Sequence, residues 1–589
     1  MAKIPFVATL VTSLSEACVR QHAARRCGSL TVTAGLAFGL AGNAHAQQVP
    51  DAGSLLRGPE QQTTPELPKP GAPAKASPRE NATPIGPTLV VKTFRFEGNS
   101  RFSEAQLQKV LADYLKRPVT LADLENAAAT VAQHYRSAGW LARVFVPPQE
   151  VDGGVIRLRV IEATYGQSRF SDDTDVPSLR VDKALIVDRV QARQGTGEKF
   201  NISSVERGLL IADDLPGVQV AGSQIGGKKE GETDVLLKAS KEPLAYGELG
   251  ADNYGSRSTG SERLLARLGL NSPLHRGDQF DLQTQFTEYM QYARLAGSMP
   301  IGADGLRLGA NAAALHYKVG TPEFHTLEPR GSSSVWGADL TYPLVRATDR
   351  NLYLGASYQQ TRPYNTAVTG VVSDYAVNDS LLRLDANLFD TLGGGGITAV
   401  NLTQVFGDVD LDGSPSQAAD KATANTQGDF RATRYRLTRT QRIASSLSAF
   451  VSYNGQIASK NLDSSEKFYL GGPYGVRAYP LYEGSGSEGQ LASAELRWQL
   501  PQGCELSAFY DWGRVKVNEH DDFPGAAALN RYELKGYGVG FSAQLPARLR
   551  ASAVAAWRDG RNPNPTPAGN DQDGSLRDPR FWLSLSWSF

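Results

Sequence analysis

The chain has 589 residues, too many for one ordinary domain, and predicts several. Its 61 lysines and arginines balance 61 aspartates and glutamates, so there is no basic excess for binding nucleic acid. A helical membrane protein shows apolar runs of about twenty residues, and the sequence has none after its N-terminus.

Residues 1–46 predict a secretory signal peptide. A positive region with Arg25 and Arg26 precedes the apolar residues 30–40, and Ala44-His-Ala46 is a small-x-small cleavage site. The apolar segment is too short for the alternative, a transmembrane anchor. The mature chain is therefore expected to begin at Gln47.

Only Cys504 remains in the predicted mature chain, because Cys18 and Cys27 lie in the signal peptide. A lone cysteine in an oxidising compartment forms no internal disulfide. We expect Cys504 to have a structural role and not to act as a nucleophile.

Residues 47–60 predict a short helix, with Leu55 and Leu56 as its apolar positions. Short helices are unstable alone, so this one needs a socket. Residues 61–87 are rich in proline and alanine and predict an extended linker. A helix on a long linker is suited to movement. A disordered mature N-terminus is the alternative.

Residues 88–165 and 166–242 predict two consecutive β-α-α-β-β modules. In the first, the predicted elements are strand Leu89–Gly98, helices Ser103–Leu115 and Thr120–Ser137, and strands Arg143–Pro147 and Val155–Ile161. In the second, they are strand Arg169–Ser171, helices Lys183–Ala192 and Ser203–Asp213, and strands Val218–Gln224 and Asp234–Ala239.

Residues 243–589 change to alternating apolar and polar segments separated by turn residues, which is typical of a transmembrane antiparallel β-barrel. At roughly 20–22 residues per strand and turn, this length predicts about 16 strands, with fourteen or eighteen as alternatives.

The last strand, Arg580–Phe589, shows the alternation most clearly. One face carries large apolar side chains (Phe581, Leu583, Leu585, Trp587 and Phe589), and the other carries serines (Ser584, Ser586 and Ser588). We expect the apolar face to contact lipid and the serine face to line a lumen. A soluble β-sandwich is the alternative, but it would rarely end its chain on such a strand.

Signals for an enzyme are weak. No Gly-x-Ser-x-Gly motif occurs, and the seven histidines have no zinc-binding spacing. Residues Gly222–Lys228 resemble a phosphate-binding loop, but Lys229 replaces the required serine or threonine. The segment also lies between two predicted strands, so a hairpin turn is expected. We predict no enzymatic activity, no metal and no cofactor.

The segment Leu470–Pro480 is rich in glycine and proline and holds one arginine, Arg477, among aromatic residues. It joins predicted strands near Leu447–Ile457 and Gln490–Leu500, and its composition favours a compact loop folded into the lumen.

Strand parity supplies partners for this arginine. If Tyr510 faces outward, Phe509, Asp511 and Gly513 face inward, and the same alternation turns Glu495 inward. We expect Arg477 to pair with Asp511, with Glu495 as the rival partner.

These residues carry a resemblance. Val476-Arg477-Ala478-Tyr479 is similar to the Val-Arg-Gly-Tyr loop motif of the BamA-type superfamily, and Phe509–Gly513 is similar to its Phe-x-Asp-x-Gly strand motif. Asp252–Gly260 resembles the first barrel strand, and Asp304-Gly305 resembles a later turn. Ala478 replaces the glycine of the motif, which removes access to positive φ there.

Over nearly all of residues 47–589, the order of these parts resembles the two-partner-secretion transporters of Gram-negative bacteria (the TpsB family, haemolysin/haemagglutinin secretion-activation type). The resemblance implies an outer-membrane barrel, a plug helix at residues 47–60 and two periplasmic POTRA domains. It also implies that Phe589 is the signal read by the barrel-assembly machinery.

The implied function is secretion of one large adhesin- or haemolysin-like partner protein without ATP. The POTRA domains capture the extended partner by strand addition, the plug helix leaves the lumen, and the Arg477 loop sets the lumen's conformation. Two alternatives remain. A barrel-assembly factor usually carries more modules and lacks the plug helix and linker, and a passive porin has no reason to carry modules.

Overall fold

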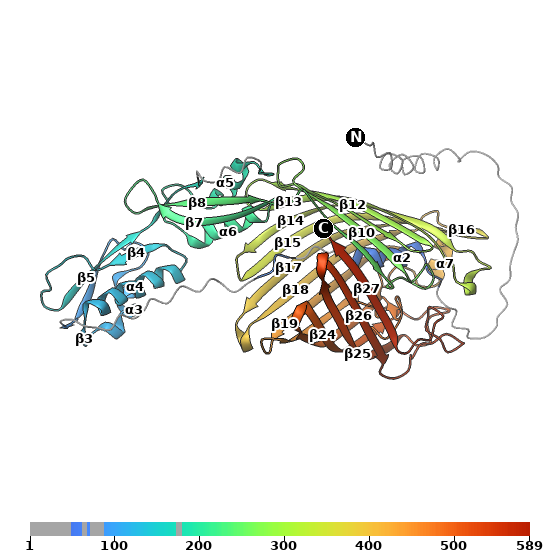
Figure 1. Ribbon diagram of the computed structural model, residues 1–589. Helices are drawn as coiled ribbons and strands as arrows, with labels where there is room; N and C mark the ends of the chain where they lie inside the picture. Colours follow the sequence, from blue (N-terminus) through green and yellow to red (C-terminus); the bar gives the residue numbers. More distant parts are fainter. Residues whose placement is uncertain (1–48, 62–66, 71–87, 172–178) are drawn as a thin grey trace. The chain divides into compact units, whose positions relative to one another are not determined.

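The computed structural model describes residues 49–61, 67–70, 88–171 and 179–589 (Figure 1). The predicted signal peptide and most of the predicted linker lie outside these residues. Within the described part of the chain, no helix combines the length and apolar character needed to cross a membrane.

The first module is a three-stranded sheet covered by two helices. Its elements are β1 (Leu89–Val90), β2 (Thr93–Glu97), α3 (Glu104–Val110), β3 (Pro118–Val119), α4 (Leu121–Ser137), β4 (Ala142–Phe145) and β5 (Val155–Glu162). The sheet order is β2-β5-β4, with β2 parallel to β5 and β4 antiparallel to it. Strand β4 is therefore an edge strand.

Helix caps explain where the first module's helices begin. Ser103 and Thr120 each form a capping box with the residue three positions later. The predicted single helix Ser103–Leu115 is interrupted, because α3 ends at Val110 and Ala112–Tyr114 forms a separate 3₁₀ turn. The predicted order of helices and strands is otherwise present.

The second module repeats this plan with β6 (Thr164–Phe170), α5 (Lys183–Gln191), α6 (Ile202–Asp213), β7 (Val218–Gly226) and β8 (Glu232–Lys241). Its sheet order is β6-β8-β7, with β6 parallel to β8. Strand β6 begins at Thr164, earlier than the predicted Arg169, because Thr164 pairs with Glu232. The phosphate-loop mimic at Gly222 lies in β7 and the turn that follows, with no helix after it.

Glu162 joins the two modules. It is buried and accepts hydrogen bonds from the side chain and backbone N–H of Ser100, the backbone N–H of Arg101 and the hydroxyl of Tyr135. Lys199 of the second module lies 3.1 Å from its carboxylate. Burial raises the pKa of Glu162, but the hydrogen bonds from Ser100 and Arg101 outweigh it and lower the pKa to about 2.

Sixteen antiparallel strands close into the barrel, as predicted. They are β9 (Ala245–Asp252), β10 (Arg263–Asn271), β11 (Gln279–Phe286), β12 (Met290–Ile301), β13 (Leu306–Lys318), β14 (Arg330–Arg346), β15 (Arg350–Ala367), β17 (Ala376–Asp390), β18 (Gly396–Asp410), β19 (Gly428–Arg442), β20 (Leu447–Ala458), β23 (Glu488–Gln499), β24 (Cys504–Lys516), β25 (Arg531–Leu545), β26 (Leu549–Arg558) and β27 (Arg580–Ser588). A short strand, β16 (Gly370–Asp374), extends the end of β15.

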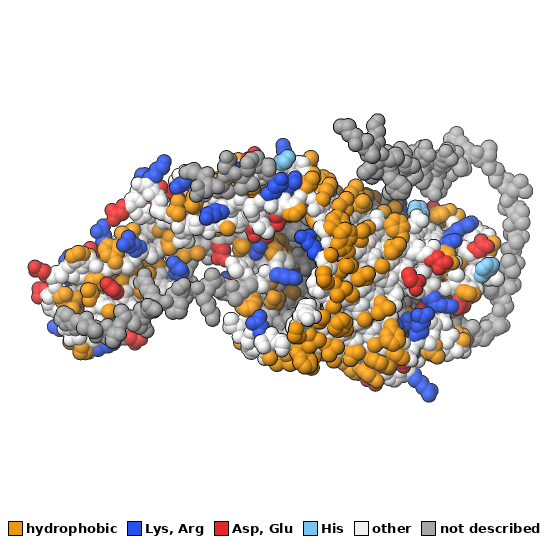
Figure 2. Space-filling view, viewed as in Figure 1, with side chains coloured by type: hydrophobic (Ala, Val, Ile, Leu, Met, Phe, Trp, Pro, Cys, Tyr) orange, Lys and Arg blue, Asp and Glu red, His pale blue; other side chains and the backbone are white. Residues whose placement is uncertain are grey.

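Apolar side chains cover the outer face of the barrel and form a broad band over its strands (Figure 2). On β27 the exposed residues are Phe581, Leu583, Leu585 and Trp587, while Arg580 and Trp582 on the opposite face are buried. This is the predicted parity. Because of this parity, the barrel presents an apolar surface to lipid. Because the strands form a closed sheet, no strand edge is left unpaired in the membrane.

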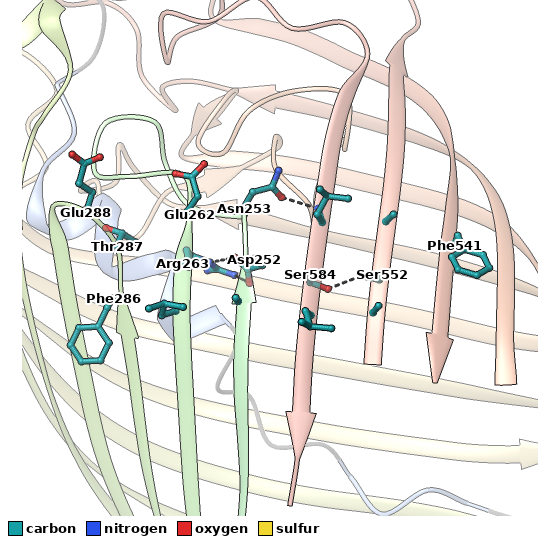
Figure 3. A pocket seen from close by; sticks show the side chains of 16 residues that line it. Asp252, Asn253, Glu262, Arg263, Phe286, Thr287, Glu288, Phe541, Ser552 and Ser584 are labelled. Carbon is teal, nitrogen blue, oxygen red and sulfur yellow. Dashed lines mark hydrogen bonds and ion pairs between the residues drawn. The ribbon is translucent and has the colours of Figure 1, made fainter. Parts of the chain in front are cut away.

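The seam between the last and first strands is the shortest contact that closes the barrel. Strands β27 and β9 share five registered pairs, from Ser584↔Asp252 to Ser588↔Glu248, whereas β9 and β10 share eight. Asn253 lengthens the seam, because its side-chain oxygen accepts the backbone N–H of Leu583 at 2.8 Å. The small outward side chains of Ala551 and Ala553 leave an outer depression of about 730 Å³ beside it, and Figure 3 shows this part of the seam.

The short helix α2 (Ala52–Gln61) packs against β13, β14 and β15 (Figure 1). Leu55 and Leu56 are buried among side chains of the barrel wall, including Leu315, Tyr317 and Val335. The barrel is thus the socket that such a short helix requires.

We predict that Glu162→Gln lowers the stability of the two modules by about 2 kcal/mol at pH 7, the size of a buried charge-assisted hydrogen bond. Trp140 is the only tryptophan outside residues 243–589, so its fluorescence in urea reports on module unfolding. Because the folded pKa lies below the unfolded value of 4.5, the stabilisation is complete above pH 4.5 and disappears as the pH falls through about 2.

The matched control is Glu97→Gln, which removes an exposed carboxylate of the same module. The difference in free energy of unfolding between wild type and Glu162→Gln should become smaller as the pH falls. The control should have the wild-type free energy of unfolding at every pH. A difference that is absent at pH 7, or unchanged at pH 2, contradicts this role for Glu162.

Candidate functional site

The loop between β20 and β23, residues 459–487, folds into the barrel and is called the inward loop below. Leu470, Val476 and Tyr479 are buried in it, and they pack against Phe509 and Leu534 of the wall. The backbone N–H of Val476 donates to the carbonyl of Leu470 at 2.7 Å, which closes the loop on itself. The glycine- and proline-rich segment therefore forms a packed structure.

Arg477 anchors the inward loop to the wall. Its Nε donates to Oδ2 of Asp511 at 2.8 Å, and its Nη2 donates to Oδ1 at 2.9 Å. The backbone N–H of Arg477 donates to the same carboxylate at 3.1 Å. The Asp511 side chain is 0 % exposed. Two parallel bonds of this kind fix orientation as well as distance.

The guanidinium also meets the second predicted partner. Its Nη1 donates to Oε2 of Glu495 at 3.1 Å, so the two carboxylates share the arginine and are not alternatives. Glu495 in turn accepts from Nε of Arg497 at 2.9 Å. A buried charge is stabilised only when it is paired, and this set pairs both acids.

Aromatic residues enclose the anchor. The Arg477 Cζ lies 3.2 Å from the ring centroid of Phe509, which gives a cation–π contact. The indole N–H of Trp582, on the last strand, donates to the carbonyl of Arg477 at 2.8 Å. The anchor therefore contacts both the wall at β24 and the strand that closes the barrel.

Gly513 is small because the inward loop lies against it. A Cβ at this position would stand 2.7 Å from Cδ2 of Leu470 and 3.2 Å from Cγ2 of Val476. The glycine of the Phe-x-Asp-x-Gly segment thus makes room for the loop that Asp511 holds.

Ala478 is not strained. The inward-loop residues with positive φ are Gly472, Tyr482 and Gly484, and Ala478 is not among them. The loss of access to positive φ at this position therefore has no consequence here, because the Ala478 backbone does not enter the left-handed region. Instead, the Ala478 Cβ approaches Gly536 of β25, where an added Cβ would stand 2.7 Å away.

A second buried charge cluster was not predicted from the sequence. Asp571, in the loop between β26 and β27, accepts from Arg558 at 2.5 Å and from Arg580 at 3.4 Å. The same loop binds Glu483 of the inward loop through Asn562 at 2.7 Å and the backbone N–H of Gln572 at 2.8 Å. Asp571, Asn562 and Gln572 lie in a long polar segment without periodicity. Glu483 and the two arginines lie outside that segment, so only the fold brings these residues together.

The inward loop also forms part of the helix socket. The hydroxyl of Ser464 donates to Asp51 at 2.9 Å, and Arg57 donates to the carbonyl of Glu466 at 3.3 Å. On the opposite side, the side chain of Asn365 accepts the backbone N–H of Ala52 at 2.9 Å. Helix α2 is thus held between the wall and the loop that Arg477 anchors.

The predicted turn at Asp304-Gly305 is where the second module docks. Arg193 of that module forms two bonds with the Asp304 carboxylate, at 2.8 and 2.7 Å, and Arg207 contacts it at 3.3 Å. Burial raises the pKa of Asp304, but the hydrogen bonds from Arg193 and Tyr342 lower it below the usual value. Asp304 therefore stays ionised and keeps the module against the turn.

Phe589 lies at the seam. Its backbone N–H and carbonyl exchange hydrogen bonds with Gly247 at 3.0 and 3.2 Å, and its ring faces outward beside Trp587. Cys504 is a free, half-buried thiol at the start of β24. Among the residues that the structure describes, no group of three or more His, Cys, Asp or Glu side chains is arranged to hold a metal.

Comparisons with known proteins identify the relatives of this chain. The family model "Haemolysin secretion/activation protein ShlB/FhaC/HecB" matches residues 231–543, and a ShlB-type POTRA domain model matches residues 89–163. The chain is 27% identical over 575 residues to the heme/hemopexin transporter protein HuxB of Haemophilus influenzae, covering 94% of this chain and 97% of that protein.

Two further relatives are named CdiB. The outer membrane transporter CdiB of Dickeya dadantii is 23% identical over 499 residues, covering 80% of this chain and 85% of that protein. The structure of CdiB from Escherichia coli superposes with a TM-score of 0.66 at 19% identity, covering 88% of this chain and 94% of that one. The structural likeness shows a shared fold.

We predict that Gly536→Ala displaces the inward loop, because its new Cβ meets that of Ala478, and that adding Ala478→Gly partly restores the loop. Ala478→Gly alone should change little, since no φ strain is relieved. Limited proteolysis of the folded barrel, followed at residues 459–487, measures loop displacement. Equal cleavage of Gly536→Ala and the double variant contradicts the contact.

Proposed function

Because the chain belongs to the haemolysin secretion/activation protein family, we propose a mechanism in which a plugged and locked barrel opens to export one large partner protein. The chain is an outer-membrane transporter of the two-partner-secretion type, with its barrel in the outer membrane and its POTRA domains in the periplasm. The alternatives of a barrel-assembly factor and a passive porin have no comparable support.

The observation that carries the mechanism is the double occupation of the lumen. Helix α2 and the inward loop both lie inside the barrel, and they contact each other at Ser464 and Glu466. An extended chain needs this space to pass. Export therefore requires that helix α2 leaves the lumen. The contacts of Arg477 then determine whether the inward loop stays in position when the helix has left.

The first module supplies a capture site. A groove of about 1040 Å³ runs between α4 and the edge strand β4. Small residues such as Ala129 and Ala132 form its floor, and Val144 and Phe145 lie on the strand side. We assign this edge as the place where an extended segment of the partner adds as a strand, with its side chains in the groove.

Energy for export comes from the partner. The periplasm offers no ATP, so a chain that folds outside the cell is drawn outward because it cannot return through the barrel in its folded form. An adhesin- or haemolysin-like β-rich protein fits this requirement.

The remaining partners belong to the membrane. The apolar outer band contacts outer-membrane lipid, and Phe589 serves as the signal read by the barrel-assembly machinery when the barrel is inserted. The exposed Phe589 ring supports this assignment, because it lies at the end of β27, whose pairing with β9 closes the barrel.

We predict that Ala132→Phe reduces export at least ten-fold by filling the groove beside β4 while the barrel assembles normally. Asn126→Phe, on an exposed part of the same helix outside the groove, is the matched control and should export normally. The amount of partner protein in the culture medium measures the effect. Normal export by Ala132→Phe would show that the groove is not the capture site.

Arg477→Ala should give a barrel that assembles yet exports at least ten-fold less. The substitution leaves the buried Asp511 carboxylate without its partner, which costs about 3–5 kcal/mol, enough to release the loop. Arg477→Lys should be intermediate, because an ammonium cannot make the bidentate contact.

Arg497→Ala is the control, since Arg497 also contacts Glu495 but lies outside the inward loop. Assembly is checked by the heat-dependent shift of the folded barrel on gels. Export at the wild-type level by Arg477→Ala would exclude a role of the Arg477 contact in export.

A further inference from the structure

Two asparagines in the barrel hold a carbonyl of the chain's own linker. The side-chain amide of Asn351 donates to the carbonyl of Pro68 at 3.1 Å, and that of Asn387 donates to the same oxygen at 2.9 Å. Pro68 belongs to the described residues Leu67–Pro70, which contain no helix or strand. Both lone pairs of one carbonyl are thus satisfied by the wall.

The two asparagines form a built site. They are registered partners on β15 and β17, and Asn351 also donates to Oδ1 of Asn387 at 2.8 Å, which fixes both amides. Asn351 is 2 % exposed and Asn387 is 8 % exposed. On the same strands Leu354 and Leu388 face outward, so the asparagines face the lumen.

The second POTRA domain orients this pair. Its Asp214 forms two bonds of 2.8 Å with Arg346, at the end of β14. Arg346 donates from Nη1 to Oδ1 of Asn351 at 3.1 Å. That bond consumes the acceptor of Asn351 and leaves its amide hydrogens for a carbonyl. The site therefore lies at the end of the barrel where the POTRA domain docks.

We propose that Asn351 and Asn387 form a binding site for the backbone of an extended polypeptide, occupied at rest by the linker and then by the exported chain. The site recognises a main-chain carbonyl, so it accepts chains of any sequence. Linker and exported chain compete for it, and occupation by the linker keeps the entrance closed. The inference rests on the proposed export function.

The physical properties of the site fit passage of a chain. Each neutral hydrogen bond changes a binding constant by roughly 2- to 12-fold, strong enough to guide a backbone and weak enough to release it. Proline-rich linkers are extended, as a chain in transit must be, so the linker is a suitable stand-in for the exported chain.

The first test measures linker occupancy. A nitroxide label at Lys69→Cys, in full-length protein carrying Cys504→Ser, should be immobile because the neighbouring carbonyl is held. Asn351→Ala/Asn387→Ala, and also Asn387→Asp, which keeps the shape but loses the donor, should make the label mobile. Asn401→Ala is the matched control, since Asn401 faces the same lumen but binds Asp385 at 2.8 Å. An immobile label in the double variant overturns the proposal.

The second test measures binding of a foreign backbone. In full-length protein with Leu55→Asp/Leu56→Asp, which removes the helix from its socket, a voltage draws a 20-residue peptide of Ser, Gly and Lys through single channels. The double asparagine variant should shorten the blockade times by about five-fold or more, the loss expected for two hydrogen bonds. Asn401→Ala should leave them unchanged.

Equal blockade times in the double variant and Asn401→Ala overturn the proposal. Neither test uses the exported partner, so both can fail while export itself is intact. Failure of the proposed export function shows instead as absence of secreted partner protein from cells that carry the wild-type barrel, whatever the two tests give.

Discussion

One ion pair determines how the lumen is filled. Arg477 and Asp511 are both removed from water, and each would be strongly destabilising there without the other. The cost of burying these charges is offset by three contacts that fix one geometry: the bidentate ion pair, the second carboxylate of Glu495 and the Phe509 ring against the guanidinium. Since Gly513 leaves space and Trp582 binds the Arg477 carbonyl, the loop has one well-defined position against the wall.

That position also determines where helix α2 binds. The anchored loop presents Ser464 and Glu466 to helix α2, which is too short to be stable without them and the wall behind it. At the POTRA end, Asp304 and Arg346 fix the second module, and Arg346 also orients the asparagines that hold the linker. A continuous series of hydrogen bonds thus joins the module to the linker, from Asp214 through Arg346 and Asn351 to Pro68.

Local physics explains what could be predicted from the sequence. Ser103 and Thr120 cap helices, and the two-residue alternation places Asp511, Glu495 and Phe581 on their observed faces without knowledge of the fold. The contacts of Asp571 with Arg558, of Asp304 with Arg193 and of Asn351 with Pro68 could not be predicted. They join separate loops or distant strands, and no periodicity links them. The effect of Ala478 could not be predicted either, because the glycine of a motif does not reveal the φ angle at that position.

The central claim is that helix α2 must leave the lumen before a partner protein can pass. A Cβ built on Gly53 lies 3.2 Å from the Cβ of Ser465, close enough for a disulfide with a small backbone shift. In a Cys504→Ser background, Gly53→Cys/Ser465→Cys should export when reduced and stop when oxidised, and a reductant should restore export. Continued export with the disulfide fully formed would contradict the account.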